Sequence, residues 1–240
     1  MRTLAKNKEK ESRTLRKRFL RGEEPENLYL TFALYFVIIF LSFMLIFVYL
    51  VGMCHVSGNS MNPSLNDDDY VLMLKNPSSF ECGDIITFRS EIVKNGVKVE
   101  ESLIKRVIGV GGDEIVFIER AGTPYVDLYR KAKNEESFNI LSGDAFGERV
   151  DDMLRSTVIS GGKYAGNIAG NASAEEIEKH KFRIDDGYLF VLGDNRNDST
   201  DSRAIGAVPV DYVRGKMFYR LTRGSILERM LLLIYREETL

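Results

Sequence analysis

The sequence is poor in the residues on which several kinds of protein chemistry depend. It holds two histidines, two cysteines and no tryptophan in 240 residues. Two histidines argue against a histidine-rich metal site or a histidine-centred triad, and two cysteines are too few for a disulfide-dense scaffold. Lys plus Arg number 33 and Asp plus Glu number 35, so the chain lacks the basic excess used to bind nucleic acid. Hydrophobic residues at 44% and charged residues at 28% are near globular averages, which excludes a disordered, collagenous or multi-span chain.

One long apolar run, from Leu28 to Met53, contains 26 residues without a charged side chain. As a helix rising about 1.5 Å per residue, it is long enough to cross a hydrocarbon layer of ~30 Å. A cleaved signal peptide has a shorter apolar core, and a buried core helix seldom stays free of charge over this length. We therefore expect a single transmembrane helix over residues 28–53.

Charge is distributed unequally on the two sides of this run. Residues 1–27 carry nine basic and five acidic side chains, whereas residues 54–240 carry 24 basic and 30 acidic ones. The positive-inside rule predicts a cytoplasmic N-terminal segment 1–27 and an extracytoplasmic catalytic domain 54–240 in a single-pass cell-membrane protein. A contact with lipid headgroups or nucleic acid is the alternative use of the basic segment.

After residue 54, short runs rich in β-branched and aromatic residues recur between turn residues. These runs are 70–74, 85–88, 103–110, 115–118, 188–192 and 216–221. They predict a mainly β domain. The more polar residues 119–183 are predicted to form an inserted subdomain of strands and loops with one short helix. Cys54 lies at the membrane edge, so we expect no disulfide between Cys54 and Cys82.

The first of three polar motifs is VSGNSMNPSL at residues 56–65. By itself this composition is typical of a turn whose hydroxyls cap backbone amides. A nucleophilic Ser60 is the alternative. It needs an exposed turn whose amides face a developing oxyanion, and Gly58 permits the close backbone approach that this requires.

The second motif, SLIKRVIGVGGD at residues 102–113, places two cations inside an apolar run. Strand alternation sends Lys105 and Arg106 to opposite faces, so one of the two is expected to point inward. An inward lysine without a carboxylate partner loses its proton, and a neutral amine is a general base. The alternative is an edge-strand lysine that discourages aggregation.

The third motif, VLGDNRNDSTDSR at residues 191–203, concentrates acids, amides, hydroxyls and two arginines at the end of a strand. Asp194, Asp198 and Asp201 could supply oxygens to calcium, but the two arginines already provide positive charge. We therefore expect a polar network beside an active site, with no metal and no organic cofactor.

In this order, behind a single anchor, the motifs resemble those of the type I signal peptidases. These are membrane-bound serine proteases that use a Ser/Lys dyad to remove signal peptides from exported proteins. The matching stretches are SGNSMNPSL at 57–65, GDIITF at 83–88, LIKRVIGVGGD at 103–113, VLGDNRNDSTDSR at 191–203 and, more loosely, AIGAVPVDYVRGKMF at 204–218. The resemblance covers the anchor and most of the catalytic core, and leaves residues 119–183 unaligned.

The resemblance implies a role for each matched residue. Ser60 would be the nucleophile and oxyanion donor, Lys105 the unprotonated general base, and Ser199 the hydroxyl that orients the lysine amine. Met61 would help to form the substrate pocket. Gly58 stands where some members have a serine whose hydroxyl is a second oxyanion donor. The salt-bridge framework around the site would consist of Arg106, Asp194, Asp201 and Arg203.

The sequence departs from the family pattern at Cys82, where arginine is usual, and at residues 110–112, where a Leu-Pro pattern is more common. Neither departure removes a catalytic group. Lys105 occupies the position of the base, so the histidine dyad of endoplasmic-reticulum relatives is not supported. His55 and His180 are expected on the surface.

The resemblance implies cleavage after small residues, in sites of the A-x-A type. The expected partners are the signal peptides of secretory preproteins and membrane lipid, with the secretion translocon as a further candidate and no nucleic acid. Leu65, Ile226 and the run 230–235 are candidates to dip into the bilayer or to pack into the core. The alternatives are a specialised relative and a non-catalytic signal-peptidase-like protein acting in the assembly of dedicated surface proteins. Soluble self-cleaving repressors also use Ser/Lys, but they carry a DNA-binding head and no anchor.

Overall fold

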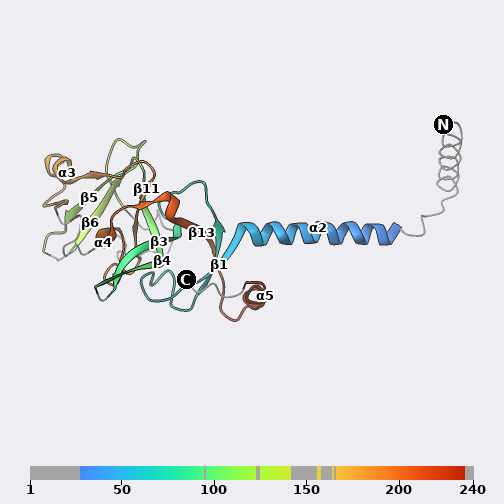
Figure 1. The fold of residues 1–240 in the computed structure, drawn as a ribbon. Helices are drawn as coiled ribbons and strands as arrows, with labels where there is room; N and C mark the ends of the chain where they lie inside the picture. The colour runs from blue at the N-terminus through green and yellow to red at the C-terminus, as the bar shows by residue number, and fades with distance from the viewer. Residues whose placement is uncertain are drawn as a thin grey trace, which may run out of the picture. The chain divides into compact units, whose positions relative to one another are not determined.

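The structure, a computed structural model, describes residues 28–94, 96–122, 125–141, 156–157, 164 and 166–235. The basic segment 1–27 lies outside these residues, as does much of the predicted insertion between 142 and 163. The chain divides into two compact units, Met1–Val48 and Tyr49–Leu240. The helix of the first unit and the β-rich second unit are drawn in Figure 1.

Helix α2 (Leu28–Leu50) takes up most of the apolar run, and nearly all of its described side chains are exposed. Residues 29–50 have the length and composition needed to cross a membrane. The helix ends three residues before the apolar run does. Residues 51–53 belong instead to strand β1 (Val51–His55), because their backbone pairs with residues 72–74 of strand β2 (Tyr70–Lys75).

A seven-stranded antiparallel sheet forms the main part of the second unit, in the order β1-β2-β13-β3-β4-β11-β12. Its remaining strands are β3 (Ile85–Lys94), β4 (Val97–Val110), β11 (Tyr188–Leu192), β12 (Val208–Pro209) and β13 (Val213–Arg220). Strands β3 and β4 form a long hairpin in which residues 85–94 pair with residues 97–106. Strand β11 pairs with β4 only over residues 106–110.

A second sheet is built around the order β10-β5-β6-β7, with β8 beside β6 and β9 parallel to β5. Its strands are β5 (Glu114–Glu119), β6 (Val126–Lys131), β7 (Asn139–Ile140), β8 (Ser156–Thr157), β9 (Ile168–Ala169) and β10 (Phe182–Arg183). The first strand of this sheet, β5, begins at Glu114, which is before the predicted start of the insertion at residue 119. Helix α3 (Ala174–His180) lies within this part and is capped by the Ser173 hydroxyl. The prediction of a mainly β domain behind an apolar helix is confirmed.

The apolar clusters cover both faces of the inner part of β4. Ile108 packs with residues of the second sheet and β11, whereas Val107 packs with Ile86, Phe88 and Val191 on the other face. The helices after β11 are α4 (Ser202–Ile205), the 3-10 helix η2 (Val210–Tyr212) and α5 (Ile226–Ile234). Cys54 and Cys82 are free cysteines. Because both faces of β4 are covered, any charged side chain on this part of the strand must be buried.

Candidate active site

The loop that carries Ser60 joins β1 to β2 and is called here the Ser60 loop (residues 56–69). Backbone hydrogen bonds between Val56 and residues 68 and 69 close its base. Met61 and Leu65 are buried in one apolar cluster with Ile104 of β4. Because Met61 follows Ser60 directly, its burial fixes the position of the serine against β4.

Lys105 reaches Ser60 from strand β4. Its side chain is buried, and Nζ donates to Ser60 Oγ at 2.8 Å and to the Ile104 carbonyl at 2.8 Å. None of the carboxylates that the structure describes forms an ion pair with it. Burial lowers the pKa of Lys105 to about 8, and the more distant charges of Asp201 and Asp194 only partly oppose this shift. The lysine therefore loses its proton above about pH 8, well below the pH at which a free lysine does, while it lies within hydrogen-bonding distance of a hydroxyl.

Arg106 is also buried, so the expectation that only one of the two neighbouring cations points inward is wrong. Alternation holds along β4, but the apolar clusters cover both of its faces. Arg106 donates through Nε to Asp194 Oδ1 at 2.8 Å and through Nη2 to Oδ2 at 2.6 Å. It also donates to the Gly83 carbonyl and to Ser64 Oγ. This bidentate pair compensates the cost of burying the guanidinium.

The third motif forms a second ion pair and contacts the Ser60 loop. Asp201 is fully buried, and Arg203 donates to both of its carboxylate oxygens at 2.8 and 2.7 Å. Asn195 donates its backbone N–H to the Ser60 carbonyl at 3.0 Å and its side-chain amide to the Asn59 carbonyl at 3.1 Å. Asn195 thus joins the two loops. Sequence reasoning missed this role, and the only signal for it was an amide inside a dense polar motif.

Ser199 does not make the hydrogen bond to Lys105 that the resemblance implies. Its Oγ is buried and has no hydrogen-bond partner among the described residues. The hydroxyl lies beside Gly193, where an added Cβ would also come within 2.6 Å of the Ser60 carbonyl oxygen. Glycine at 193 is therefore what lets Ser199 and the Ser60 backbone approach each other this closely.

Arg196 is a second buried group of this motif with unused donors. Its Nε donates to the Gly193 carbonyl at 3.0 Å, but Nη1 and Nη2 have no hydrogen-bond partner among the described residues. Burial lowers the pKa of Arg196 to about 10. This arginine adds positive charge near the site without an ion pair of its own.

Two of the three aspartates considered for calcium, Asp194 and Asp201, are bound by arginines. Asp194 is paired with Arg106 and Asp201 with Arg203. In the described part of the chain, no group of three or more His, Cys, Asp or Glu residues could hold a metal ion. The carboxylates of Asp194 and Asp201 therefore serve as partners for arginine.

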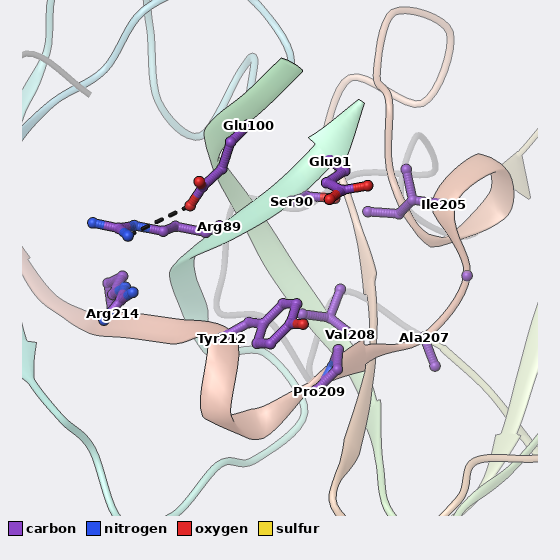
Figure 2. A pocket seen from close by; sticks show the side chains of 11 residues that line it. Arg89, Ser90, Glu91, Glu100, Ile205, Ala207, Val208, Pro209, Tyr212 and Arg214 are labelled. Carbon is purple, nitrogen blue, oxygen red and sulfur yellow. Dashed lines mark ion pairs between the residues drawn. The ribbon is translucent and has the colours of Figure 1, made fainter. Parts of the chain in front are cut away.

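A cleft of about 530 Å³ lies elsewhere on the second unit. Figure 2 shows Arg89 and Glu100 joined by an ion pair of 3.4 Å, with Tyr212 beside Val208 and Pro209. Neither of the two candidate catalytic residues lines this cleft. The cleft is lined by residues of both charges, and none of its lining residues belongs to the Ser60 loop.

Comparison with known proteins gives consistent matches. A family model described as signal peptidase, peptidase S26, matches residues 29–222. A signal peptidase I from Bacillus caldolyticus is 31% identical over 165 residues, which cover 69% of this chain and 76% of the relative. One from Aquifex aeolicus is 28% identical over 224 residues, covering 79% and 82%. A solved signal peptidase I from Enterococcus faecalis V583 is 22% identical at a TM-score of 0.34, covering 59% of this chain and 98% of that one.

Proposed function

This chain belongs to the peptidase S26 family of signal peptidases, serine peptidases that remove signal peptides, and on that basis we propose that Ser60 and Lys105 are its catalytic dyad. The observation that carries the proposal is the separation of 2.8 Å between Lys105 Nζ and Ser60 Oγ, at an amine buried without a carboxylate partner. A nucleophile and a base within hydrogen-bonding distance are the minimum that acyl transfer requires.

In the proposed reaction, the lone pair of neutral Lys105 Nζ accepts the Ser60 proton while Oγ attacks the scissile carbonyl carbon. The resulting tetrahedral intermediate collapses as the carbon–nitrogen bond breaks, and Lys105 gives the proton to the leaving amine. The signal peptide is then held as an ester on Ser60. Lys105 next takes a proton from water, whose oxygen attacks the ester carbonyl carbon. As the carbon–Oγ bond breaks, Lys105 returns the proton to Ser60 Oγ and the signal peptide leaves with a free carboxylate.

The oxyanion of each intermediate needs a donor close to Ser60. Gly58 has φ of 86° and donates its N–H to Asp67 Oδ1 at 2.7 Å, so this amide already has an acceptor. No atom lies within 4 Å of the position that a Gly58 Cβ would occupy. We assign the oxyanion contact to the Ser60 N–H, with Gly58 leaving space beside it.

The surroundings of Ser60 favour a substrate with small side chains. Val56, Met61 and Leu65 pack against Ile104 in one apolar cluster. Because Val56, Met61 and Leu65 are almost fully buried, we expect room beside Ser60 only for a small apolar substrate side chain, which supports cleavage after small residues. Because β11 pairs with β4 only from residue 106 onward, residues 102–104 offer an edge along which an extended substrate can add as a strand.

The apolar helix α2 is consistent with membrane anchoring. We propose that residues 1–27 are cytoplasmic and that the second unit acts on the opposite side, as the charge distribution indicates. Ser60 follows the end of α2 at Leu50 by ten residues, so the chain allows at most about 35 Å between them. This short connection supports a reaction near the interface, where a membrane-inserted signal peptide exposes its cleavage site, with the translocon as a candidate neighbour.

The proposal is tested with the full chain in detergent and a purified preprotein. Ser60→Ala and Lys105→Ala should each reduce cleavage at least about a thousandfold, while Ser57→Ala, an exposed serine of the same loop, should cleave at the parental rate. Mass spectrometry should place the cut after a small residue. Substantial turnover by either variant, with circular dichroism showing an intact fold, would reject the dyad. No cleavage by the parental chain would favour a non-catalytic role in assembly.

A further inference from the structure

Helix α5 turns a continuous apolar face outward. Its exposed apolar side chains are Ile226, Leu227, Met230, Leu233 and Ile234, with Leu233 89% exposed. At about 100° per residue these five positions fall within an arc of about 120°. Glu228 and Leu231 are buried on the opposite side of the helix. A helix with one apolar residue buried, one (Leu232) partly buried and five exposed is unusual for a surface in contact with water alone.

The C-terminal end of α5 is held at the point where the apolar anchor ends. The Tyr235 hydroxyl donates to the Val51 carbonyl at 2.9 Å. Val51 is the first residue after α2, and its cross-strand partner Leu74 is 41% exposed. In Figure 1, α5 accordingly lies close to β1. If α2 spans a membrane, as proposed above, the exposed face of α5 belongs to the part of the second unit that is nearest to lipid.

The charge around α5 is opposite to that of the rest of the unit. Residues 213–235 contain five basic residues and one acidic residue, and that acidic residue, Glu228, is buried. Residues 54–240 as a whole carry 24 basic and 30 acidic residues. Arg229, the only charged residue exposed on α5, borders the apolar face. Basic residues beside an apolar helical face fit an anionic lipid surface.

The segment that leads into α5 is also attached to the Ser60 loop. Arg220 Nη2 lies 2.8 Å from Asp69 Oδ2, and its Nη1 donates to the Ser64 carbonyl at 3.0 Å. Leu221 is buried and donates its N–H to the Tyr70 carbonyl at 2.8 Å. Asp69 is itself buried. Whatever surface α5 binds, these contacts therefore also restrain the distance between that surface and the Ser60 loop.

We propose that α5 is a second membrane contact, whose outward apolar face lies in the interface of an anionic bilayer leaflet and sets the height of the Ser60 loop above the lipid. The occupant of this face is lipid, because the face adjoins the end of the anchor and is bordered by the exposed Arg229. The placement of the bilayer beside Val51 rests on the proposed function.

The absence of tryptophan from the chain provides a direct test, because one introduced tryptophan is the only indole in the protein. Leu233→Trp and the control Tyr212→Trp, which replaces an exposed residue of η2 in the cleft of Figure 2, are reconstituted as full chains. The vesicles contain phosphatidylglycerol and phosphatidylcholine, with or without brominated acyl chains. Bromine should quench Leu233→Trp at least twofold and leave Tyr212→Trp unchanged.

Equal quenching at the two positions would overturn the proposal. So would a blue-shifted Leu233→Trp emission that brominated lipid does not quench, since that result would mean that protein, such as a second copy, covers the face. The readout needs no catalysis, and it can be repeated in the Ser60→Ala background. A failure of the dyad and a failure of the lipid contact are therefore distinguishable.

A second measurement separates docking from folding. Met230→Glu combined with Leu233→Glu should slow cleavage of a vesicle-inserted preprotein at least fivefold and leave cleavage of a short soluble peptide in detergent unchanged. Tyr212→Glu should change neither rate. An equal loss in both assays would show that α5 is only structural, and no loss in either would show that its exposed face does not contribute.

Discussion

Two adjacent residues of β4 show two outcomes for a buried cation. On one side of the strand, Lys105 contacts a hydroxyl and a backbone carbonyl and has no ion pair among the described residues. On the other side, Arg106 binds both oxygens of Asp194. Both side chains are buried, with exposures of 2% and 5%. Burial alone therefore does not decide how the charge of a basic side chain is compensated.

The difference lies in the partner. A buried ammonium without a carboxylate is disfavoured relative to the neutral amine, so the pKa of Lys105 falls to about 8. The bidentate pair of Arg106 with Asp194 instead links β4 to the third motif. One side of the strand thus carries the proposed base and the other a structural pair.

The largest effect is expected from Lys105→Arg, which puts on the reactive side a group that stays charged. Arginine cannot lose its proton near neutral pH, so it cannot serve as the base. We expect kcat/KM for a preprotein to fall at least about a thousandfold, with the thermal unfolding transition still cooperative. Residual activity within tenfold of the parent would mean that no deprotonated side chain is needed at position 105.

Arg106→Met should have the largest effect on stability, because it leaves the Asp194 carboxylate buried and unpaired. The expected loss is about 3 to 5 kcal/mol of unfolding free energy, measured by denaturant titration in detergent. Arg120→Met, which breaks a partly exposed pair with Asp127, is the matched control and should lose less than about 1 kcal/mol. Equal losses in the two variants would remove the distinction between buried and exposed pairs.

The pH dependence of the activity should report the amine and not the guanidinium. Burial lowers the pKa of Lys105 to about 8, and the base is protonated and inactive below that pH. We expect kcat/KM to approach a tenfold fall per pH unit below this value, or about a fiftyfold fall between pH 8 and pH 6. Steady-state rates over pH 6 to 10 provide the measurement. A flat profile between pH 6 and 8 would contradict the assignment of Lys105 as the base.

Lys105→Met should have the smallest effect. It should raise the unfolding free energy at pH 7, whereas Arg106→Met should lower it. The folded pKa of Lys105 lies below its unfolded value, so the unfolded chain binds more protons between about pH 8 and 10.5 and stability rises with pH there. Methionine removes a buried ammonium that is unfavourable at pH 7, a gain of about 1 to 3 kcal/mol. Thermal melting of the variant and the parent should show a smaller gain at pH 10 than at pH 7. A loss of stability at pH 7 would show that the ammonium is well compensated.

Several elements followed from local pattern. The strands around residues 103–110, 115–118 and 188–192 lie where β-branched runs between turn residues predicted them, since that preference is largely local. The apolar run predicted the helix but not its end, because pairing of residues 51–53 with β2 depends on residues about twenty positions away. The contact between Asn195 and the Ser60 loop had no local signal at all. The Ser199 hydrogen bond, implied by resemblance, is not formed among the described residues.

The sequence by itself determined the apolar helix, the β character of the second unit and the order of the three polar motifs, because periodicity, length and composition act over a few residues. Only the tertiary structure decided which cation is paired and which is not. Ser60 and Lys105 are 45 residues apart in the chain, and Arg106 and Asp194 are 88 apart. Desolvation and ion pairing depend on which distant groups the fold brings together, so the lowered pKa of Lys105 arises only when the sheet forms.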